Sequence, residues 1–171
     1  KDVSELIDLN KRLLDINIEN FINKNLYENI KYNNPKKLNK FEYQVYSQNG
    51  EDGIIAEIFN RIGVTNKFCV EFGAQNGLAN NTTYLMLKDW TGAWIEANSN
   101  FIEQIDSKYG VLIRNNKLLL KKAFVTVENI ESLFKELNVP EEFDLLSIDL
   151  DGNDYWVWKA IKKFSPRVVV I

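Results

Sequence analysis

The sequence predicts an α/β protein with a doubly wound parallel sheet and helices on both of its faces. Short apolar runs alternate with segments of helical periodicity over most of the chain, an order typical of right-handed crossovers between parallel strands. A glycine-bearing turn at 73–77 follows the first apolar run, and Glu71, Glu96 and Asp149 end three of the runs. Open parallel sheets bind ligands at these carboxyl ends of strands.

Composition narrows the classes of protein to consider. The chain has 171 residues, of which 45% are hydrophobic, and this fits one domain with a sizeable core. A net charge of −3 gives no reason to expect nucleic acid or an anionic membrane as a partner. No apolar run reaches the ~20 residues of a membrane span, and the N-terminus lacks a signal-peptide core. The single cysteine, Cys69, excludes an internal disulfide framework and favours a reducing, cytoplasmic location.

Residues 1–45 are predicted to form a helical appendage and linker in front of a domain at 46–171. Leucine and isoleucine recur at three- to five-residue steps up to about residue 32, with polar residues between them. Pro35 ends this helix, because the residue before a proline avoids helical geometry. We expect the helix to pack on the domain or on a second subunit, which would make the protein a homo-oligomer.

The rest of the chain divides into alternating elements. Strands are expected at 68–71, 93–96, 117–125, 144–149 and 166–171. Helices are expected at 54–63, 78–87, 100–109, 127–137 and 155–164. Ser47, Glu51 and Asp52 are expected to cap the first of these helices, and Asn80 or Asn81 the second.

The turn at 73–77 is the first candidate site. Its glycines would let the backbone approach a ligand, and the first amides of the next helix would face that ligand. Glu96 follows Glu71 by 25 residues and ends the second strand. An acid about 20 residues past such a turn can accept both hydroxyls of an adenosine ribose. On its own Glu96 would be an ordinary strand-end carboxylate.

A second candidate site contains three carboxylates within six residues: Asp149, Asp151 and Asp154. Their mutual repulsion is unfavourable unless a cation or a shared proton offsets it. The spacing of Asp149 and Asp151 suits a hard metal such as Mg²⁺. The alternative is that Asp154 caps a helix and Asp151 occupies a turn. A calcium-binding helix-loop-helix is excluded, because the twelfth position is Ala160.

Four segments together resemble a known family. SQNGED at 47–52, EFGAQNG at 71–77, WIEAN at 94–98 and LLSIDLDGNDYWVWKAI at 145–161 resemble segments of class I S-adenosylmethionine-dependent methyltransferases, and the last three occur in the order of that family's motifs. The similarity is to the FkbM-like group and covers about residues 46–171. It implies a Rossmann-like fold and S-adenosylmethionine as the cofactor. Gln75 departs from the family pattern, and the family's sixth and seventh strands are missing after Ile171, so the domain is expected to be incomplete at its C-terminus.

The resemblance also implies roles for residues. Glu71, Gly73 and Gly77 would shape the pocket for the methionine end of the cofactor, Glu96 would hold the ribose, and Asp149 would lie near the methyl group. The cofactor-binding residues implied are Gln48, Glu71, Gly73, Ala74, Gln75, Asn76, Gly77, Glu96, Ala97, Asn98, Ala123, Phe124 and Asp149.

FkbM-like enzymes commonly methylate hydroxyls of sugars or of surface-glycan (capsule) decorations, so the implied partner is a small-molecule or glycan-precursor acceptor. The chain has no histidine, and Asp149, Asp151 or a metal that they hold would then be the base or activator.

Two other functions remain open from the sequence. A nicotinamide-dependent oxidoreductase would also have acids flanking a glycine turn, but residues 73–77 do not follow the G-x-G-x-x-G pattern. A non-catalytic nucleotide-binding or assembly module would use the first helix as its interface.

Overall fold

The computed structural model describes residues 13–14, 16–18, 20–22, 24–25, 28, 30 and 33–171. The chain divides into two units, Lys1–Glu42 and Tyr43–Ile171. In the first unit the described residues at 13–14, 16–18 and 20–22 are helical, and a short helix, η3, spans Asn39–Phe41. Most residues of the helix predicted up to residue 32 lie outside the described residues. The prediction that this helix forms oligomer contacts concerns the same residues and stays a prediction. Within the described part of the chain, no helix combines the length and the apolar character that crossing a membrane requires.

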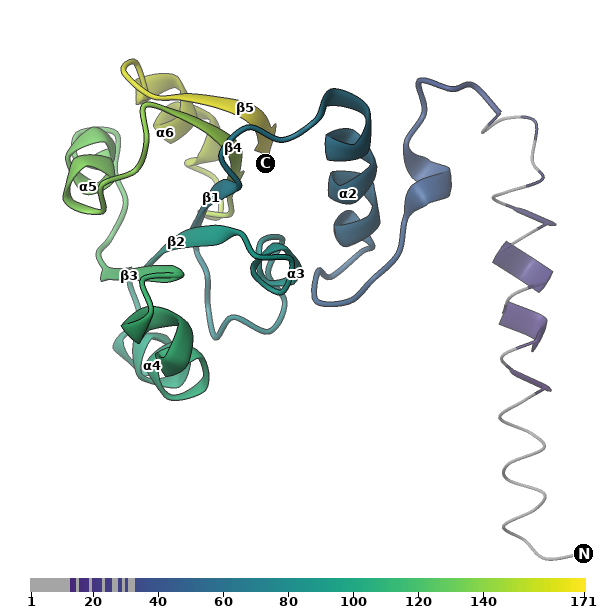
Figure 1. Ribbon diagram of the computed structural model, residues 1–171, viewed down its shortest axis with the longest axis horizontal. Coiled ribbons are helices and arrows are strands. Elements are labelled where there is room, and N and C mark those ends of the chain that lie inside the picture. The colour runs from purple at the N-terminus through teal and green to yellow at the C-terminus, as the bar shows by residue number, and fades with distance from the viewer. Residues whose placement is uncertain are drawn as a thin grey trace, which may run out of the picture. The chain divides into compact units, whose positions relative to one another are not determined.

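The second unit is built on one parallel sheet of five strands in the order β3-β2-β1-β4-β5 (Figure 1). The strands are β1 (Phe68–Phe72), β2 (Thr91–Glu96), β3 (Leu118–Lys122), β4 (Glu142–Ile148) and β5 (Ser165–Val170). All four pairings are parallel, so the predicted fold class is confirmed. The strand order reverses between β1 and β4, and a reversal of this kind opens a crevice at the carboxyl ends of the two strands.

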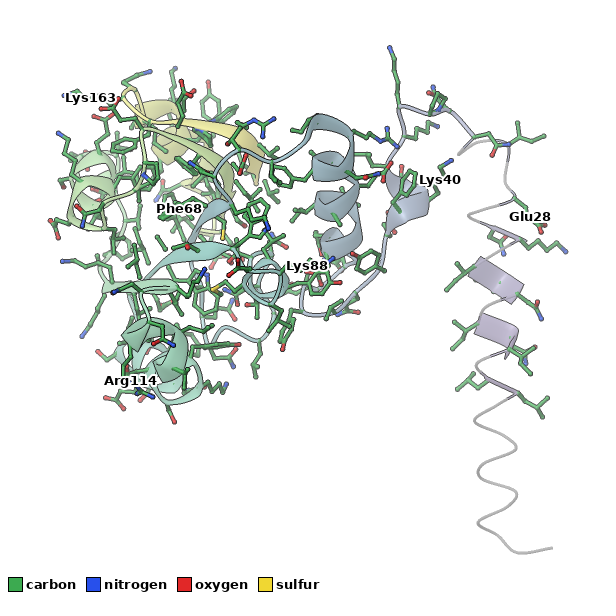
Figure 2. The ribbon with its side chains drawn as sticks, viewed as in Figure 1. Glu28, Lys40, Phe68, Lys88, Arg114 and Lys163 are labelled. Atoms are coloured by element: carbon green, nitrogen blue, oxygen red, sulfur yellow. The ribbon has the colours of Figure 1, made fainter. Side chains whose placement is uncertain are left out.

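Helices cover both faces of the sheet. The first face carries α2 (Glu51–Ile62), α3 (Thr83–Met86) and α4 (Ser99–Arg114), and the second carries α5 (Ile130–Glu136) and α6 (Asp154–Ala160). Alternation along β1 produces the two cores, because successive side chains of a strand point to opposite faces. Cys69 packs in the cluster that contains Phe59 of α2, whereas Phe72 lies 5.7 Å from Phe134 of α5 between ring centroids. Phe68 lies inside the unit, whereas Arg114 and Lys163 lie at its periphery (Figure 2).

A buried carboxylate joins the amino ends of β1, β4 and β5. The Asp144 side chain accepts hydrogen bonds from the backbone N–H groups of Thr65, Asn66 and Lys67 at 2.8–3.0 Å. It also pairs with Arg167 Nη1 at 2.7 Å. Burial alone would raise the pKa of Asp144, but these donors outweigh burial and hold that pKa below its ordinary value. The carboxylate therefore fastens the loop before β1 to the sheet.

Two predicted helices are shorter in the structure. The helix predicted to reach Phe164 ends at Ala160, because the N–H groups of Lys162 and Lys163 both donate to Glu131 Oε1 at 2.7 Å instead of continuing the helix. The helix predicted at 78–87 is reduced to the four residues of α3.

Other strand and helix boundaries also differ from the prediction. The strand β2 begins at Thr91 instead of 93, because Thr91 and Gly92 pair with β1 and β3. The helix α4 continues from residue 109 to Arg114. The helix α5 begins at Ile130 instead of 127, because Asn129 Oδ1 accepts from the N–H of Thr126 at 2.8 Å and holds a turn there.

Candidate functional site

Two cavities lie at the carboxyl ends of the central strands, where the strand order reverses. The larger, of about 400 Å³, is lined by Gln48, Glu51, Glu71, Gly73, Gln75, Ala79, Asn80, Asn81, Ile148, Asp149, Asp151, Asp154, Val170 and Ile171. The smaller, of about 160 Å³, is lined by Gly73, Ile95, Glu96, Ala97, Ala123, Phe124, Val125, Leu150, Asp151 and Asn153. Gly73 and Asp151 line both, so the cavities meet at these two residues. We call this meeting point the junction.

Gly73, the residue after β1, lies close to the segment that follows β4. Its φ is +69°, and a Cβ at this position would lie 2.0 Å from the carbonyl oxygen of Asp149. Its N–H donates to the carbonyl of Ile95 at 3.1 Å, which ties the turn to β2. Only glycine fits, because any side chain would push apart the two strands at which the sheet order reverses.

Gly77 is required for a different reason than the one expected. Its φ is +77°, and a Cβ would lie 2.6 Å from the Tyr109 ring and 2.8 Å from the Trp94 ring. Tyr109 Oη and Thr83 Oγ1 both donate to the Gly77 carbonyl. Aromatic side chains of the protein thus fill the space that a side chain at residue 77 would need, and the contact of Gly77 with a cofactor stays a prediction.

The turn also leads into the next helix differently than expected. Residues 73–82 separate β1 from α3, so no helix amides directly follow the glycine turn. Ala74, predicted to bind the cofactor, is 1% exposed and packs in the core with Met86, Trp94 and Ile105. Gln75 lies in the turn with φ +46°, is exposed and lines the larger cavity.

Glu71 is buried and lines the larger cavity, and other residues of the protein donate hydrogen bonds to both of its carboxylate oxygens. Its carboxylate accepts from Asn80 Nδ2, from the N–H groups of Asn81 and Thr82, from Thr82 Oγ1 and from Ser147 Oγ. Burial raises the pKa of Glu71, while these donors act against that rise. Asn80 and Asn81 therefore bind this carboxylate, and the expectation that one of them caps a helix is wrong.

The Glu71 network decides the shape of the segment before α3. Thr82 Oγ1 also accepts from Trp94 Nε1 at 2.7 Å, which links the network to β2. Because these bonds hold residues 80–82 against β1, the helix starts only at Thr83. Ser147 is the signal that could have revealed the network, since it is a buried polar residue between Leu146 and Ile148 in the apolar half of β4.

Glu96 is the last residue of β2, and its side chain binds the turn that follows β1. It is 7% exposed, and its two oxygens accept from the N–H groups of Gln75 at 2.8 Å and Asn98 at 2.7 Å. A carboxylate oxygen has two acceptor positions, so each can still receive a donor from a ligand in the smaller cavity. The tertiary structure thus brings together the turn and the acid that the sequence separates by some twenty residues.

The other predicted binding residues divide into two groups. Ala97, Ala123 and Phe124 line the smaller cavity, and Gln48 lines the larger one. Asn76 and Asn98 line neither: Asn76 Oδ1 accepts from the N–H of Leu78, and Asn98 Oδ1 accepts from the N–H of Asn100 and caps α4.

The segment that presents Gln48 is anchored by a reciprocal pair. The N–H of Ser47 donates to Asp52 Oδ2 at 2.9 Å, and the N–H of Asp52 donates to Ser47 Oγ at 3.0 Å. Ser47 therefore accepts from an N–H of the first turn of α2, as expected of a capping residue, although Gly50 occupies the N-cap position. Asp52 instead binds the N–H groups of residues 45–47, which precede the helix. Glu51 accepts from the N–H of Asn49 at 2.7 Å and lines the larger cavity.

The three aspartates after β4 have distinct environments. Asp154 accepts from the N–H groups of Leu150 at 2.7 Å and Gly152 at 3.0 Å, and these bonds outweigh burial and lower its pKa. Partial burial raises the pKa of Asp149, and the charges of Asp151 and Asp154 raise it further. Asp154 therefore shapes the loop, whereas Asp149 has the higher proton affinity expected of a base.

A metal ion has little support at this loop. Among the residues that the structure describes, no three His, Cys, Asp or Glu side chains converge as ligands. Asp149, Asp151 and Asp154 all line the larger cavity, but their carboxylates do not converge on one point, so they do not form the joint oxygen donor set that the predicted Mg²⁺ requires.

No family model matches the chain, and no curated protein sequence is detectably similar to it. Its structure is similar to that of an O-methyltransferase from Bacillus cereus in complex with SAH, with a TM-score of 0.48, 15% identity, and coverage of 85% of this chain and 68% of that one. Precorrin-6y C5,15-methyltransferase from Geobacter metallireducens matches with a TM-score of 0.43 and 16% identity, over 71% of this chain and 61% of that one.

A third similar structure is the glycopeptide N-methyltransferase MtfA complexed with S-adenosyl-L-methionine. The TM-score is 0.42 and the identity 12%, over 75% of this chain and 54% of MtfA. The chain thus spans between about half and two thirds of the length of these three proteins.

Proposed function

We propose that the protein is an S-adenosylmethionine-dependent methyltransferase. The observation that carries the proposal is the position of Glu96, a nearly buried carboxylate that holds the turn after β1 and faces a cavity at the reversal of strand order. A carboxylate at this place suits a ribose, whose two hydroxyls donate hydrogen bonds. The proposal agrees with the resemblance of four sequence segments to the FkbM-like group.

The lining of the two cavities suits the two ends of this cofactor. The smaller cavity combines Glu96 with the apolar side chains of Ala123, Phe124 and Val125, which suits a nucleoside with a flat, apolar base. The larger cavity contains side-chain amides, such as Gln48 and Gln75, together with carboxylates, which suit the ammonium and carboxylate of a methionine chain. Bound there, the cofactor would supply a methyl group activated by the adjoining sulfonium.

Asp149 is the residue that we assign as the general base. It lines the larger cavity, and its raised pKa increases its capacity to accept a proton. It would take the proton that an acceptor hydroxyl loses as the oxygen forms its bond to the methyl group. Asp151 lines the same cavity and is the second candidate for this role. We assign no step to Mg²⁺, because the donor set does not fit it.

The acceptor that we propose is a hydroxyl of a sugar or of a surface-glycan precursor. This assignment follows the FkbM-like resemblance and accords with a cavity of polar lining and about 400 Å³.

Isothermal titration calorimetry of the 171-residue chain tests the cofactor assignment. We expect binding of S-adenosylmethionine and S-adenosylhomocysteine and no binding of NAD. Binding of NAD alone would replace the proposal by an oxidoreductase, and binding of none of the three would favour a non-catalytic module.

A further inference from the structure

The charges around the larger cavity are of one sign. Its lining contains five carboxylates and no lysine or arginine: Glu51, Glu71, Asp149, Asp151 and Asp154. The ion pairs of the described residues all lie elsewhere, so none of the five has a cationic partner in this part of the chain. Uncompensated carboxylates around one cavity favour a ligand that brings positive charge.

These carboxylates differ in the number of hydrogen bonds that they accept from other residues of the protein. Glu71 accepts five hydrogen bonds, Asp154 holds two N–H groups of its own loop, and Glu51 binds Asn49. Asp151 and Asp149 form neither a hydrogen bond nor an ion pair through their side chains within the described residues. Their charge is therefore available to a ligand.

Asp151 lies at the junction of the two cavities. It lines both cavities, as Gly73 does, so a molecule that occupies both must pass beside it. In S-adenosylmethionine the sulfur atom joins the adenosine to the methionine chain. If the adenosine lies beside Glu96 and the methionine chain in the larger cavity, the sulfur lies at the junction.

We propose that Asp151 recognises the sulfonium charge, so that the protein binds S-adenosylmethionine more tightly than S-adenosylhomocysteine. The inference rests on the proposed function and adds a selectivity to it. The two ligands share their ribose, base, ammonium and carboxylate, and they differ in the methyl group and the positive charge on sulfur. Transfer of the methyl group removes that charge and weakens the hold on the product, which makes product inhibition small.

The test compares two dissociation constants in three proteins by calorimetry. The parent is expected to bind S-adenosylmethionine roughly tenfold more tightly than S-adenosylhomocysteine, the effect of one additional charge interaction in a partly solvated site. Asp151→Asn is expected to remove most of this ratio while leaving the affinity for S-adenosylhomocysteine within about twofold. Asparagine adopts the left-handed conformation of residue 151, where φ is +50°, so the loop should keep its shape.

Asp106→Asn is the matched control. It removes the same charge from an exposed residue of α4 that lines neither cavity, and the ratio should equal that of the parent.

Three outcomes would count against the inference. Equal affinities in the parent, or tighter binding of S-adenosylhomocysteine, overturn it while leaving the proposed function intact. An equal loss for both ligands in Asp151→Asn overturns it as well, because the ratio of the two dissociation constants then does not depend on the Asp151 charge. Binding of neither ligand by the parent rejects the proposed function itself.

Discussion

Glu96 offers the sharpest test of the site, because the same carboxylate has one role in the fold and another in binding. Its two oxygens accept from the N–H groups of Gln75 and Asn98. Glu96→Gln keeps the size of the side chain but leaves only one acceptor oxygen. The other end of the amide then presents a donor to a backbone donor, so one of these two N–H groups must lose its partner. Glu96→Ala removes both partners.

The size of the effect follows from these contacts. A hydrogen bond to a charged group contributes about 1.5–3 kcal/mol, and Glu96 is 7% exposed, so water replaces it only in part. We expect Glu96→Gln to lower the free energy of unfolding by about 1.5–3 kcal/mol and Glu96→Ala by more. The loss of two charge-assisted bonds to a ribose should cost Glu96→Ala about 2–4 kcal/mol of S-adenosylhomocysteine affinity, or roughly 30- to 1000-fold.

Urea denaturation and calorimetry separate the two roles. Affinity is measured well below the unfolding midpoint of each variant, so that weaker binding is not caused by unfolded protein. Glu103→Gln is the control, because Glu103 is exposed on α4 and lines neither cavity; its free energy of unfolding should change by less than about 0.5 kcal/mol. If Glu96→Ala binds S-adenosylhomocysteine as the parent does, Glu96 is not the ribose ligand. If the unfolding midpoint of Glu96→Ala also equals that of the parent, the hydrogen bonds from Glu96 to the turn contribute nothing to the free energy of unfolding.

Three further predictions concern other residues. Gly73→Ala should lower the free energy of unfolding by several kcal/mol more than Gly63→Ala, as measured in urea, because both positions have φ +69° but only at Gly73 would a Cβ collide with the Asp149 carbonyl; equal losses would show that the close approach is absent. Asp149→Asn should reduce turnover on the order of 10²-fold with cofactor affinity little changed, and the parent rate should rise with pH through the raised pKa of Asp149. A variant with the parental rate and pH profile would exclude Asp149 as the base. Asp144 has a folded-state pKa below its unfolded value, so its contribution to stability is complete above about pH 4 and is lost as pH falls through the lower value. Acid denaturation followed by circular dichroism should show this loss in the parent but not in Asp144→Asn, and identical acid profiles would contradict the assigned role.

The sequence by itself determined the fold class and the residue types at the ends of the strands. Apolar runs bounded by glycine or acids, between segments of helical period, were sufficient to predict parallel strands and covering helices, because burial on two faces requires a continuous apolar strand. For the same reason Glu96 and Asp149 could be singled out: a carboxylate at the end of such a run lies at the edge of the sheet where ligands bind.

Local patterns were less reliable where a distant side chain competes with the backbone. The helix expected at 78–87 is shortened because Glu71, on a different element, binds residues 80–82. The helix expected to reach Phe164 stops because Glu131 of α5 binds its last N–H groups. Propensity and period describe only neighbours in the sequence, so such long-range bonds remain invisible to them.

Only the tertiary structure decided how the site is assembled. The order β3-β2-β1-β4-β5 places the end of β4 against the turn after β1, which explains why Gly73 must be glycine and why Asp151 lies where two cavities meet. It also gave Gly77 and Ala74 a packing role that the sequence did not indicate, because Trp94, Tyr109 and Met86 fill the space beside them. Strand order depends on which crossovers bury the most apolar surface over the whole chain, and no single segment carries that information.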